Sequence, residues 1–231
     1  GKEAVVVGAG PSLIANLPKL QLLLSKKERI IVICVATATK VLIAAGIHPD
    51  FVVIIDKDTP LNHPLLCDFS KMKNSNLIYF PLVIPEVLKA WQGTRFLAYS
   101  SGAIFDEVKL KFPSGSLFSG GSVIHVATDL AVKLGCRKII FFGADFAYPD
   151  NRTHAGHESG KLTNYDDVTP PQQATRSVKN WHGKDIKTLA SFIGYLVELE
   201  RYIKSHPEIE FQNSSKSGAY IFGTKLIEEE V

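Results

Sequence analysis

Cysteine is scarce in this sequence, with three residues among 231. Cys34, Cys67 and Cys136 lie far apart, mostly in apolar surroundings, and their number is odd. A disulfide framework uses an even set of cysteines, and a structural zinc site uses closely spaced pairs, so the sequence favours neither. The pattern is typical of reduced core residues in a cytosolic protein.

Long apolar runs and a strong charge of one sign are also missing. No stretch reaches the roughly 18 apolar residues that a membrane-spanning helix needs, and no secretory signal heads the chain. The net charge is only +3, and no basic run is interleaved with aromatic residues. We therefore expect a cytoplasmic protein that neither spans a membrane nor binds nucleic acid.

An initiator methionine is absent as well, and Gly1 is followed almost at once by an apolar run. This predicts a piece cut from a longer protein. A length of 231 residues allows one large or two small domains, and 45% hydrophobic with 21% charged residues is an ordinary globular composition.

Apolar strand-like runs alternate with helical patterns along the whole sequence, which is typical of a parallel sheet. We therefore predict a single α/β domain over residues 1–231, with a Rossmann-like, mostly parallel sheet and helices on both faces. The predicted strands are Ala4–Val7, Ile30–Val35, Phe51–Ile55, Leu77–Phe80, Arg95–Ala98, Lys138–Phe142 and Glu210–Gln212. The predicted helices are Leu17–Lys27, Thr37–Ala45, Pro85–Trp91, Val123–Leu134 and Lys184–Ser205.

Residues 144–181 break this alternation. They are rich in Asp, Asn, His, Thr and Pro and show little apolar periodicity. A loop of this length inside a compact domain is usually functional or disordered. It follows the strand Lys138–Phe142, and open α/β sheets bind ligands at the carboxyl ends of their strands. The sequence thus predicts a long active-site loop or lid.

The first predicted strand ends in a glycine turn, Gly8–Ser12. Gly8 and Gly10 let a ligand approach the main chain, and Pro11 suits the first turn of a helix. Such a turn directs free amides and a helix N-terminus at one point, which favours a phosphate or nucleotide site. Leu13 replaces the third glycine of the dinucleotide fingerprint, and a tight turn without a ligand is the alternative.

Three further groups are expected at the same edge of the sheet. Thr37 follows the second strand, Asp56 and Asp58 follow the third, and Gly143–Phe146 follows the strand before the long loop. The paired aspartates suit a divalent cation between two phosphates, because hard cations prefer carboxylate oxygens. A solvated turn that caps the next helix is the alternative.

Three histidines are candidates for chemistry. His154 and His157 have a spacing that two transition-metal ligands can use, but contact with a phosphate or acceptor, or simple exposure, explains them equally. His182 is predicted at the start of a helix, where an imidazole suits the role of general base. Helix capping and packing beside Trp181 are its alternatives.

With these residues, the sequence resembles the domain-of-unknown-function family that contains flagellar motility accessory factors and archaeal-type 6-hydroxymethylpterin diphosphokinases. It is most similar to the accessory-factor branch, whose central domain resembles bacterial sialyltransferases. The segments that carry the resemblance are VVVGAGPSL, AGIHPDFVVIIDKD, FSGGSVIHVATDLAVKLGCRKIIFFGADFAYPDNRTHAGH, WHGKDIKTLASFIGYLVELE and NSSKSGAYIFGTKLIEE.

The resemblance implies roles for matching positions. His182 would be the catalytic base, and Tyr148 would aid departure of the nucleotide. Tyr165 would be a further contact from the loop, where we also expect contacts from His154 and His157. The nucleotide-binding residues that we expect are Gly8, Gly10, Pro11, Ser12, Thr37, Ser119, Gly120 and Asp145.

The function implied is transfer of a nonulosonic acid, of the pseudaminic or sialic acid type, from a CMP-sugar to Ser or Thr of flagellin, with no required cofactor. One alternative is a Mg²⁺-dependent 6-hydroxymethylpterin diphosphokinase, in which Asp56 and Asp58 hold the metal between ATP phosphates. Another is a non-catalytic domain that binds a nucleotide or flagellin without turnover.

Overall fold

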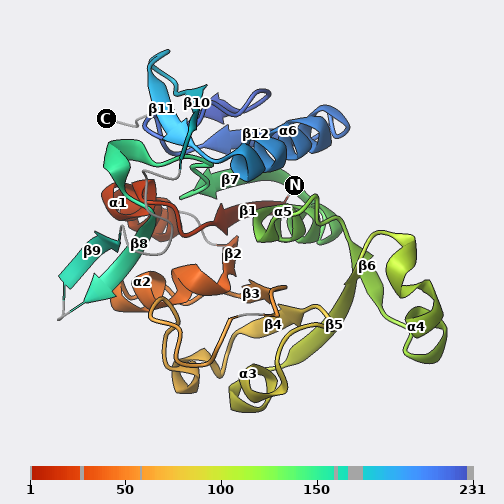
Figure 1. The fold of residues 1–231 in the computed structure, drawn as a ribbon. Helices are drawn as coiled ribbons and strands as arrows, with labels where there is room; N and C mark the ends of the chain where they lie inside the picture. Colours follow the sequence, from red (N-terminus) through yellow and green to blue (C-terminus); the bar gives the residue numbers. More distant parts are fainter. Residues whose placement is uncertain (1, 27–28, 58, 159–160, 166–173, 228–231) are drawn as a thin grey trace.

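A nine-stranded sheet with the order β13-β12-β7-β1-β2-β3-β4-β5-β6 organises the protein (Figure 1). The computed structural model describes residues 2–26, 29–57, 59–158, 161–165 and 174–227. All neighbouring strands of this sheet are parallel. The strands are β1 (Lys2–Val7), β2 (Ile30–Val35), β3 (Phe51–Ile54), β4 (Asn76–Tyr79), β5 (Arg95–Ser100), β6 (Gly115–Leu117), β7 (Cys136–Phe142), β12 (Glu210–Asn213) and β13 (Lys225–Leu226).

Helices connect these strands and pack against the sheet, which confirms the predicted Rossmann-like α/β fold. The helix α5 contacts β1, β2, β3 and β7, and α1 contacts β7. The α-helices are α1 (Ser12–Lys26), α2 (Thr39–Ala44), α3 (Pro85–Ala90), α4 (Asp106–Lys111), α5 (Val123–Lys133) and α6 (Ala190–Lys204). Short 3₁₀ turns are η1 (Ala36–Ala38), η2 (Phe69–Met72), η3 (Ala103–Phe105) and η4 (Pro149–Asn151).

The strand order reverses between β1 and β7. From β1 the chain adds strands outward to β6, then returns to place β7 on the other side of β1. In open α/β sheets the crevice outside the carboxyl ends of the strands at such a reversal is the usual ligand site. The turns that leave β1 and β7 therefore occupy the position where a ligand is expected.

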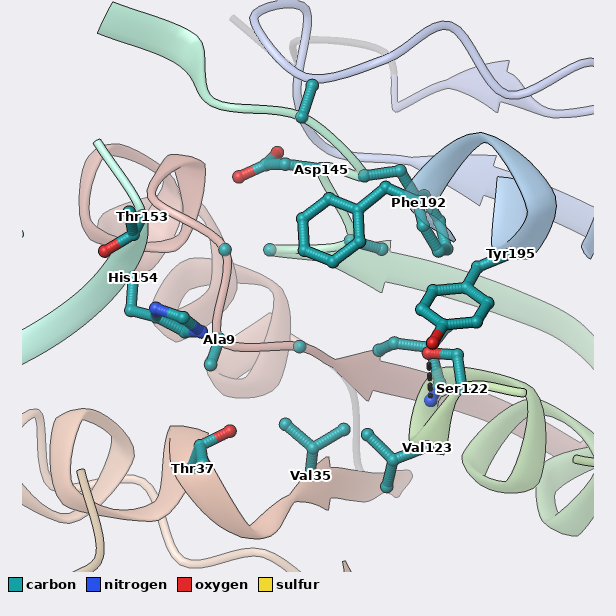
Figure 2. Close-up of a pocket in the computed structure, with 17 residues that line it drawn as sticks. Ala9, Val35, Thr37, Ser122, Val123, Asp145, Thr153, His154, Phe192 and Tyr195 are labelled. Carbon is teal, nitrogen blue, oxygen red and sulfur yellow. Dashed lines mark hydrogen bonds between the residues drawn. The ribbon is translucent and has the colours of Figure 1, made fainter. Parts of the chain in front are cut away.

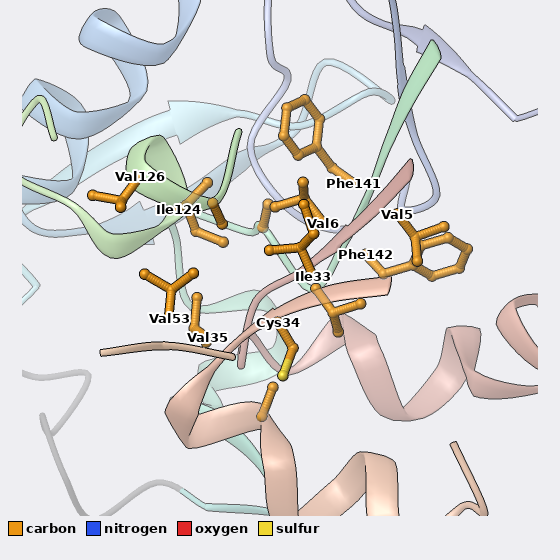
Figure 3. Close-up of a cluster of buried hydrophobic side chains, with 14 of the residues drawn as sticks. Val5, Val6, Ile33, Cys34, Val35, Val53, Ile124, Val126, Phe141 and Phe142 are labelled. Atoms are coloured by element: carbon orange, nitrogen blue, oxygen red, sulfur yellow. The ribbon is translucent and has the colours of Figure 1, made fainter. Parts of the chain in front are cut away.

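The core lies where apolar runs meet at the centre of the sheet. The predicted strand Ala4–Val7 has no exposed surface, because β2 and β7 pair with its two edges and α5 packs against it. A strand of this kind needs apolar side chains on both faces, and the unbroken run supplies them. Side chains from β1, β2, β3, β7 and α5 fill this core together, among them Val6, Ile33, Val53, Phe141 and Val126 (Figure 3).

Two antiparallel hairpins lie in the polar part of the chain, where the sequence predicts a long loop and the start of a helix. Within residues 144–181, predicted as one long loop, β8 (His154–Glu158) pairs with β9 (Lys161–Tyr165). Further on, β10 (Arg176–Lys179) pairs with β11 (Asp185–Thr188). The predicted helix from Lys184 is thus wrong at its start, since α6 begins only at Ala190. These strands carry mainly polar residues, so they lack the apolar alternation that predicts a strand.

Among the helices described, none has both the length and the apolar character that crossing a membrane requires.

Candidate ligand-binding site

A pocket of about 190 Å³ lies at the carboxyl ends of β1 and β7, where the strand order reverses (Figure 2). In Figure 2, Thr153 and His154 lie on one side of it, and Ser122, Val123 and Tyr195 on the other. Its volume is below the roughly 300–1,000 Å³ of pockets that bury a drug-sized ligand, so it suits one part of a larger ligand. Its lining residues are Gly8, Ala9, Gly10, Val35, Thr37, Ser122, Val123, Ile124, Gly143, Ala144, Asp145, Phe146, Ala147, Thr153, His154, Phe192 and Tyr195.

The glycine turn after β1 packs directly on the turn after β7. Gly10 N donates a hydrogen bond to Gly143 O at 2.9 Å. A Cβ atom on Gly8 or Gly10 would lie only 2.5 or 2.6 Å from that same oxygen. Glycine is therefore needed here because two backbone turns touch, before any ligand is considered.

Asp145 places a carboxylate at the N-terminus of α1. Its Oδ2 accepts a hydrogen bond from Ser12 N at 2.8 Å. The carboxylate lies between two glycines, since a Cβ on Gly10 would be 2.4 Å from Oδ2 and one on Gly218 would be 2.4 Å from Oδ1. Asp145 is 3% exposed, and burial raises the pKa of its carboxyl to about 6, although hydrogen bonding from Ser12 acts to lower it.

The amides of Gly10 and Ser12 have hydrogen-bond partners within the protein. The sequence predicts that the amides of Gly10 to Ser12 hold a phosphate. In the structure Gly10 N and Ser12 N donate to Gly143 O and Asp145 Oδ2, and Pro11 carries no N–H. The Asp145 carboxylate takes the place at the helix N-terminus that a phosphate would take. The glycine turn therefore shapes the pocket wall, and its contact with a phosphate stays a prediction.

The raised pKa of Asp145 predicts a stability that falls as pH rises. A carboxyl whose pKa is 3.8 when unfolded and about 6 when folded binds its proton more tightly in the folded state. This group thus stabilises the protein fully below pH 3.8, and the contribution is lost as pH rises through 6. We expect Asp145→Asn to be more stable than the native protein at pH 8 by up to about 3 kcal/mol, with the difference shrinking toward pH 4. Urea denaturation at both pH values measures this, and a difference independent of pH would contradict it.

The loop before α5 brings a second helix N-terminus to the pocket. Gly120 and Gly121 have φ angles of +44° and +86°, in the left-handed region that glycine favours. Ser122 caps the helix, with its Oγ accepting a hydrogen bond from Ile124 N at 3.4 Å. Neither α1 nor α5 has an acidic residue in its first turn, but Asp145 places its carboxylate at the N-terminus of α1. The N-terminus of α5 favours a negatively charged group.

Two aromatic residues of α6 complete the pocket and were not predicted from the sequence. Phe192 and Tyr195 lie in the first half of α6, and both line the cavity. Their position is fixed by the fully buried His125, whose Nδ1 lies 2.6 Å from Ser119 O and whose Nε2 lies 2.8 Å from Tyr195 O. Burial lowers the pKa of this imidazole. The aromatic side chains give the pocket an apolar wall opposite Thr153 and His154 (Figure 2).

The structure brings several predicted residues together. Gly8, Gly10, Thr37, Asp145 and His154 all line the pocket, although they come from four separate parts of the sequence. The strand β8 is held there because Ala155 N donates to Ala9 O at 2.8 Å. Four predicted nucleotide contacts do not line the cavity, namely Pro11, Ser12, Ser119 and Gly120.

The two residues predicted to be catalytic do not line the pocket. His182 is exposed in the turn between β10 and β11, where its amide donates to Asn180 Oδ1 at 2.9 Å. It therefore lies in a hairpin turn and not at the start of a helix. Tyr148 is buried, with its ring 5.6 Å from that of Phe192, and its amide donates to Lys187 O at 2.9 Å. The buried ring of Tyr148, in contact with Phe192, suits a role in packing.

Of the two predicted metal residues, the structure describes only Asp56. Asp56 is exposed after β3 and does not line the pocket, and Asp58 lies outside the described residues. The backbones of His157 and Tyr165 belong to the hairpin β8–β9, but their side chains lie outside the described part of the chain. Within that part, no three His, Cys, Asp or Glu residues form a cluster that could hold a metal ion.

The fold and the pocket together define a Rossmann-like α/β domain with a pocket at the reversal of its strand order. A family model described as 6-hydroxymethylpterin diphosphokinase MptE-like matches residues 1–151. The chain belongs to this family, which confirms the resemblance noted in the sequence.

A solved structure adds a comparison over nearly the whole chain. The structure of the MAf glycosyltransferase from Magnetospirillum magneticum AMB-1 is similar to this chain with a TM-score of 0.70 and 20% sequence identity. The match covers 98% of this chain and 34% of the other, so this chain spans about a third of the length of that relative. The likeness establishes a shared fold. Among curated proteins no match was found.

Proposed function

We propose that this chain is the donor-binding domain of a glycosyltransferase that moves a nonulosonic acid from a CMP-sugar to Ser or Thr of flagellin. The observation that carries the proposal is the pocket at the reversal of the strand order, lined by four of the residues predicted to bind the nucleotide. The similarity in fold to a protein described as a glycosyltransferase supports it.

The pocket offers separate places for the parts of a nucleotide. The rings of Phe192 and Tyr195 provide an apolar wall against which a flat base packs. The N-terminus of α5, with Ser122 as its N-cap, provides a binding position for the phosphate. Since the cavity holds only part of a ligand, the sugar extends from it toward the solvent and the acceptor.

We assign the acid–base step to His154 in place of His182. The His154 side chain lies on the pocket wall beside Ala9, whereas His182 is exposed on the hairpin turn (Figure 2). A general base must reach the proton it removes. His154 would take the proton of the acceptor hydroxyl as its oxygen bonds to the anomeric carbon, and CMP would leave with the electron pair of the broken bond.

A second candidate is the Mg²⁺-dependent diphosphokinase, and the family match over residues 1–151 is the observation that favours it. In that reaction a divalent cation neutralises the adjacent ATP phosphates. Its carboxylate ligands would be Asp56 and Asp58, of which Asp56 lies outside the pocket lining.

Metal dependence separates the two reactions. Transfer from a CMP-sugar breaks a bond to a single phosphate and builds positive character on the sugar, so helix amides and hydroxyl groups suffice. We expect release of CMP from the donor to persist in EDTA, and the double variant Asp56→Asn, Asp58→Asn to lower it less than threefold. Loss of transfer in EDTA that Mg²⁺ restores, or ATP-dependent diphosphorylation of a hydroxymethylpterin, would favour the diphosphokinase instead.

A further inference from the structure

Exposed apolar side chains gather on one projection of the molecule, formed by η3 and α4 between β5 and β6. In Figure 1, α4 extends away from the sheet beyond its edge strand β6. Within this projection Ile104 is 82% exposed, Leu110 85%, Phe112 63% and Val108 40%. The helix α4 has no buried residue at all. Large apolar groups concentrated in this way mark an interaction surface.

The projection is held firmly at its base. Tyr99 of β5 is fully buried, and its hydroxyl donates a hydrogen bond to Phe112 O at 2.8 Å. The Tyr99 ring also contacts the Phe105 ring, with their centroids 5.5 Å apart. The apolar side chains of α4 are thus presented by an anchored segment.

The charges of α4 indicate which partner fits. Asp106 and Glu107 lie in its first turn, and Lys109 and Lys111 in its last. Asp106 and Lys109 pair within the helix at 3.3 Å. Glu107 and Lys111 are exposed, and neither forms an ion pair in the described part of the chain.

A helix that is acidic at one end and basic at the other is complementary to a second copy of itself in the antiparallel direction. Ile104 lies in η3, Val108 in α4 and Phe112 directly after it, at four-residue spacing along the sequence. Glu107 and Lys111 lie one turn apart on α4 beside this apolar stripe. Antiparallel packing of two stripes brings Glu107 of each copy toward Lys111 of the other. A two-fold axis produces both contacts at once, because such an interface uses the same patch on both subunits.

We infer that α4 is the self-association surface of this protein, through which two copies form a dimer with antiparallel α4 helices. Sedimentation velocity over a range of protein concentrations tests this. We expect a concentration-dependent dimer, and at least a tenfold weaker association for Ile104→Asp combined with Phe112→Asp. Leu22→Asp is the matched control, because Leu22 is also an exposed apolar residue, 48% exposed, but lies on α1.

Charge reversal tests the antiparallel arrangement itself. Glu107→Lys and Lys111→Glu should each weaken the dimer at least tenfold, because each places like charges together. The double variant Glu107→Lys, Lys111→Glu should restore the association. A native protein that stays monomeric at all concentrations would overturn the proposal. So would a dimer that the aspartate substitutions leave unchanged, or one that the double reversal fails to restore.

Discussion

Replacement of His154 by alanine is expected to lower sugar transfer by about 10²–10⁴-fold, the usual contribution of a positioned general base. This corresponds to about 3–5 kcal/mol of transition-state stabilisation. His154 lines the pocket through β8, which is tied to the glycine turn by the bond from Ala155 N to Ala9 O. Since the acceptor loses its proton only as the sugar is transferred, the loss should appear in kcat. Affinity for CMP, measured by calorimetry, should change less than threefold.

His182→Ala is the matched control for this experiment. His182 is an exposed histidine on a hairpin turn, so its removal should leave transfer within about threefold of the native rate. The two variants together locate the base. Loss of turnover in His182→Ala with none in His154→Ala would contradict our assignment and return the role to the residue that the sequence resemblance indicates.

Gly10→Val is expected to cost about 3 kcal/mol or more of folding free energy, at the upper end of what overpacking usually costs. A Cβ at this position would lie 2.4 Å from Asp145 Oδ2 and 2.6 Å from Gly143 O. The second of these atoms is backbone and also accepts the hydrogen bond from Gly10 N, so it cannot move without breaking the contact between the two turns. Urea denaturation, or loss of soluble protein, measures the effect.

Gly194→Ala provides the control for a glycine without such contacts. Gly194 lies within α6, and a Cβ built on it would meet no atom within 4 Å. Alanine favours a helix interior over glycine by up to about 1 kcal/mol, so this variant should be more stable than the native protein. A Gly10→Val protein as stable as the native one would show that the two turns separate easily, and would contradict the close packing described here.

The fold was predictable because unbroken apolar runs are a strong local signal for strands in a parallel sheet. The unbroken apolar run Ala4–Val7 and, in β7, the segment Lys138–Phe142 were predicted as strands, and the structure has both at the centre of the sheet. The glycine turn and Asp145 were also predictable as parts of one edge, since parallel strands end on the same side. The contact between Gly10 and Gly143 was not, because it depends on which strands are neighbours.

The rest of the site depends on contacts between distant segments. Phe192 and Tyr195 look like ordinary core residues of an amphipathic helix, and only the packing of α6 beside the pocket gives them a place in its lining. His182 was misplaced because the polar sequence around it has no apolar alternation, so the hairpin β10–β11 could not be distinguished from the start of a helix. His154, to which we assign the acid–base step, was predicted only as one of several loop contacts. The polar sequence around it also lacks apolar alternation, so the hairpin β8–β9 was not recognised.

The claim on which the rest depends is that the pocket at the reversal of the strand order binds a nucleotide. A crystal structure of the protein soaked in millimolar CMP tests it most directly. We predict CMP in the cavity between His154 and Tyr195, with its phosphate at Ser122 and the N-terminus of α5. An empty pocket at that concentration, or CMP bound only at another place, would contradict the account.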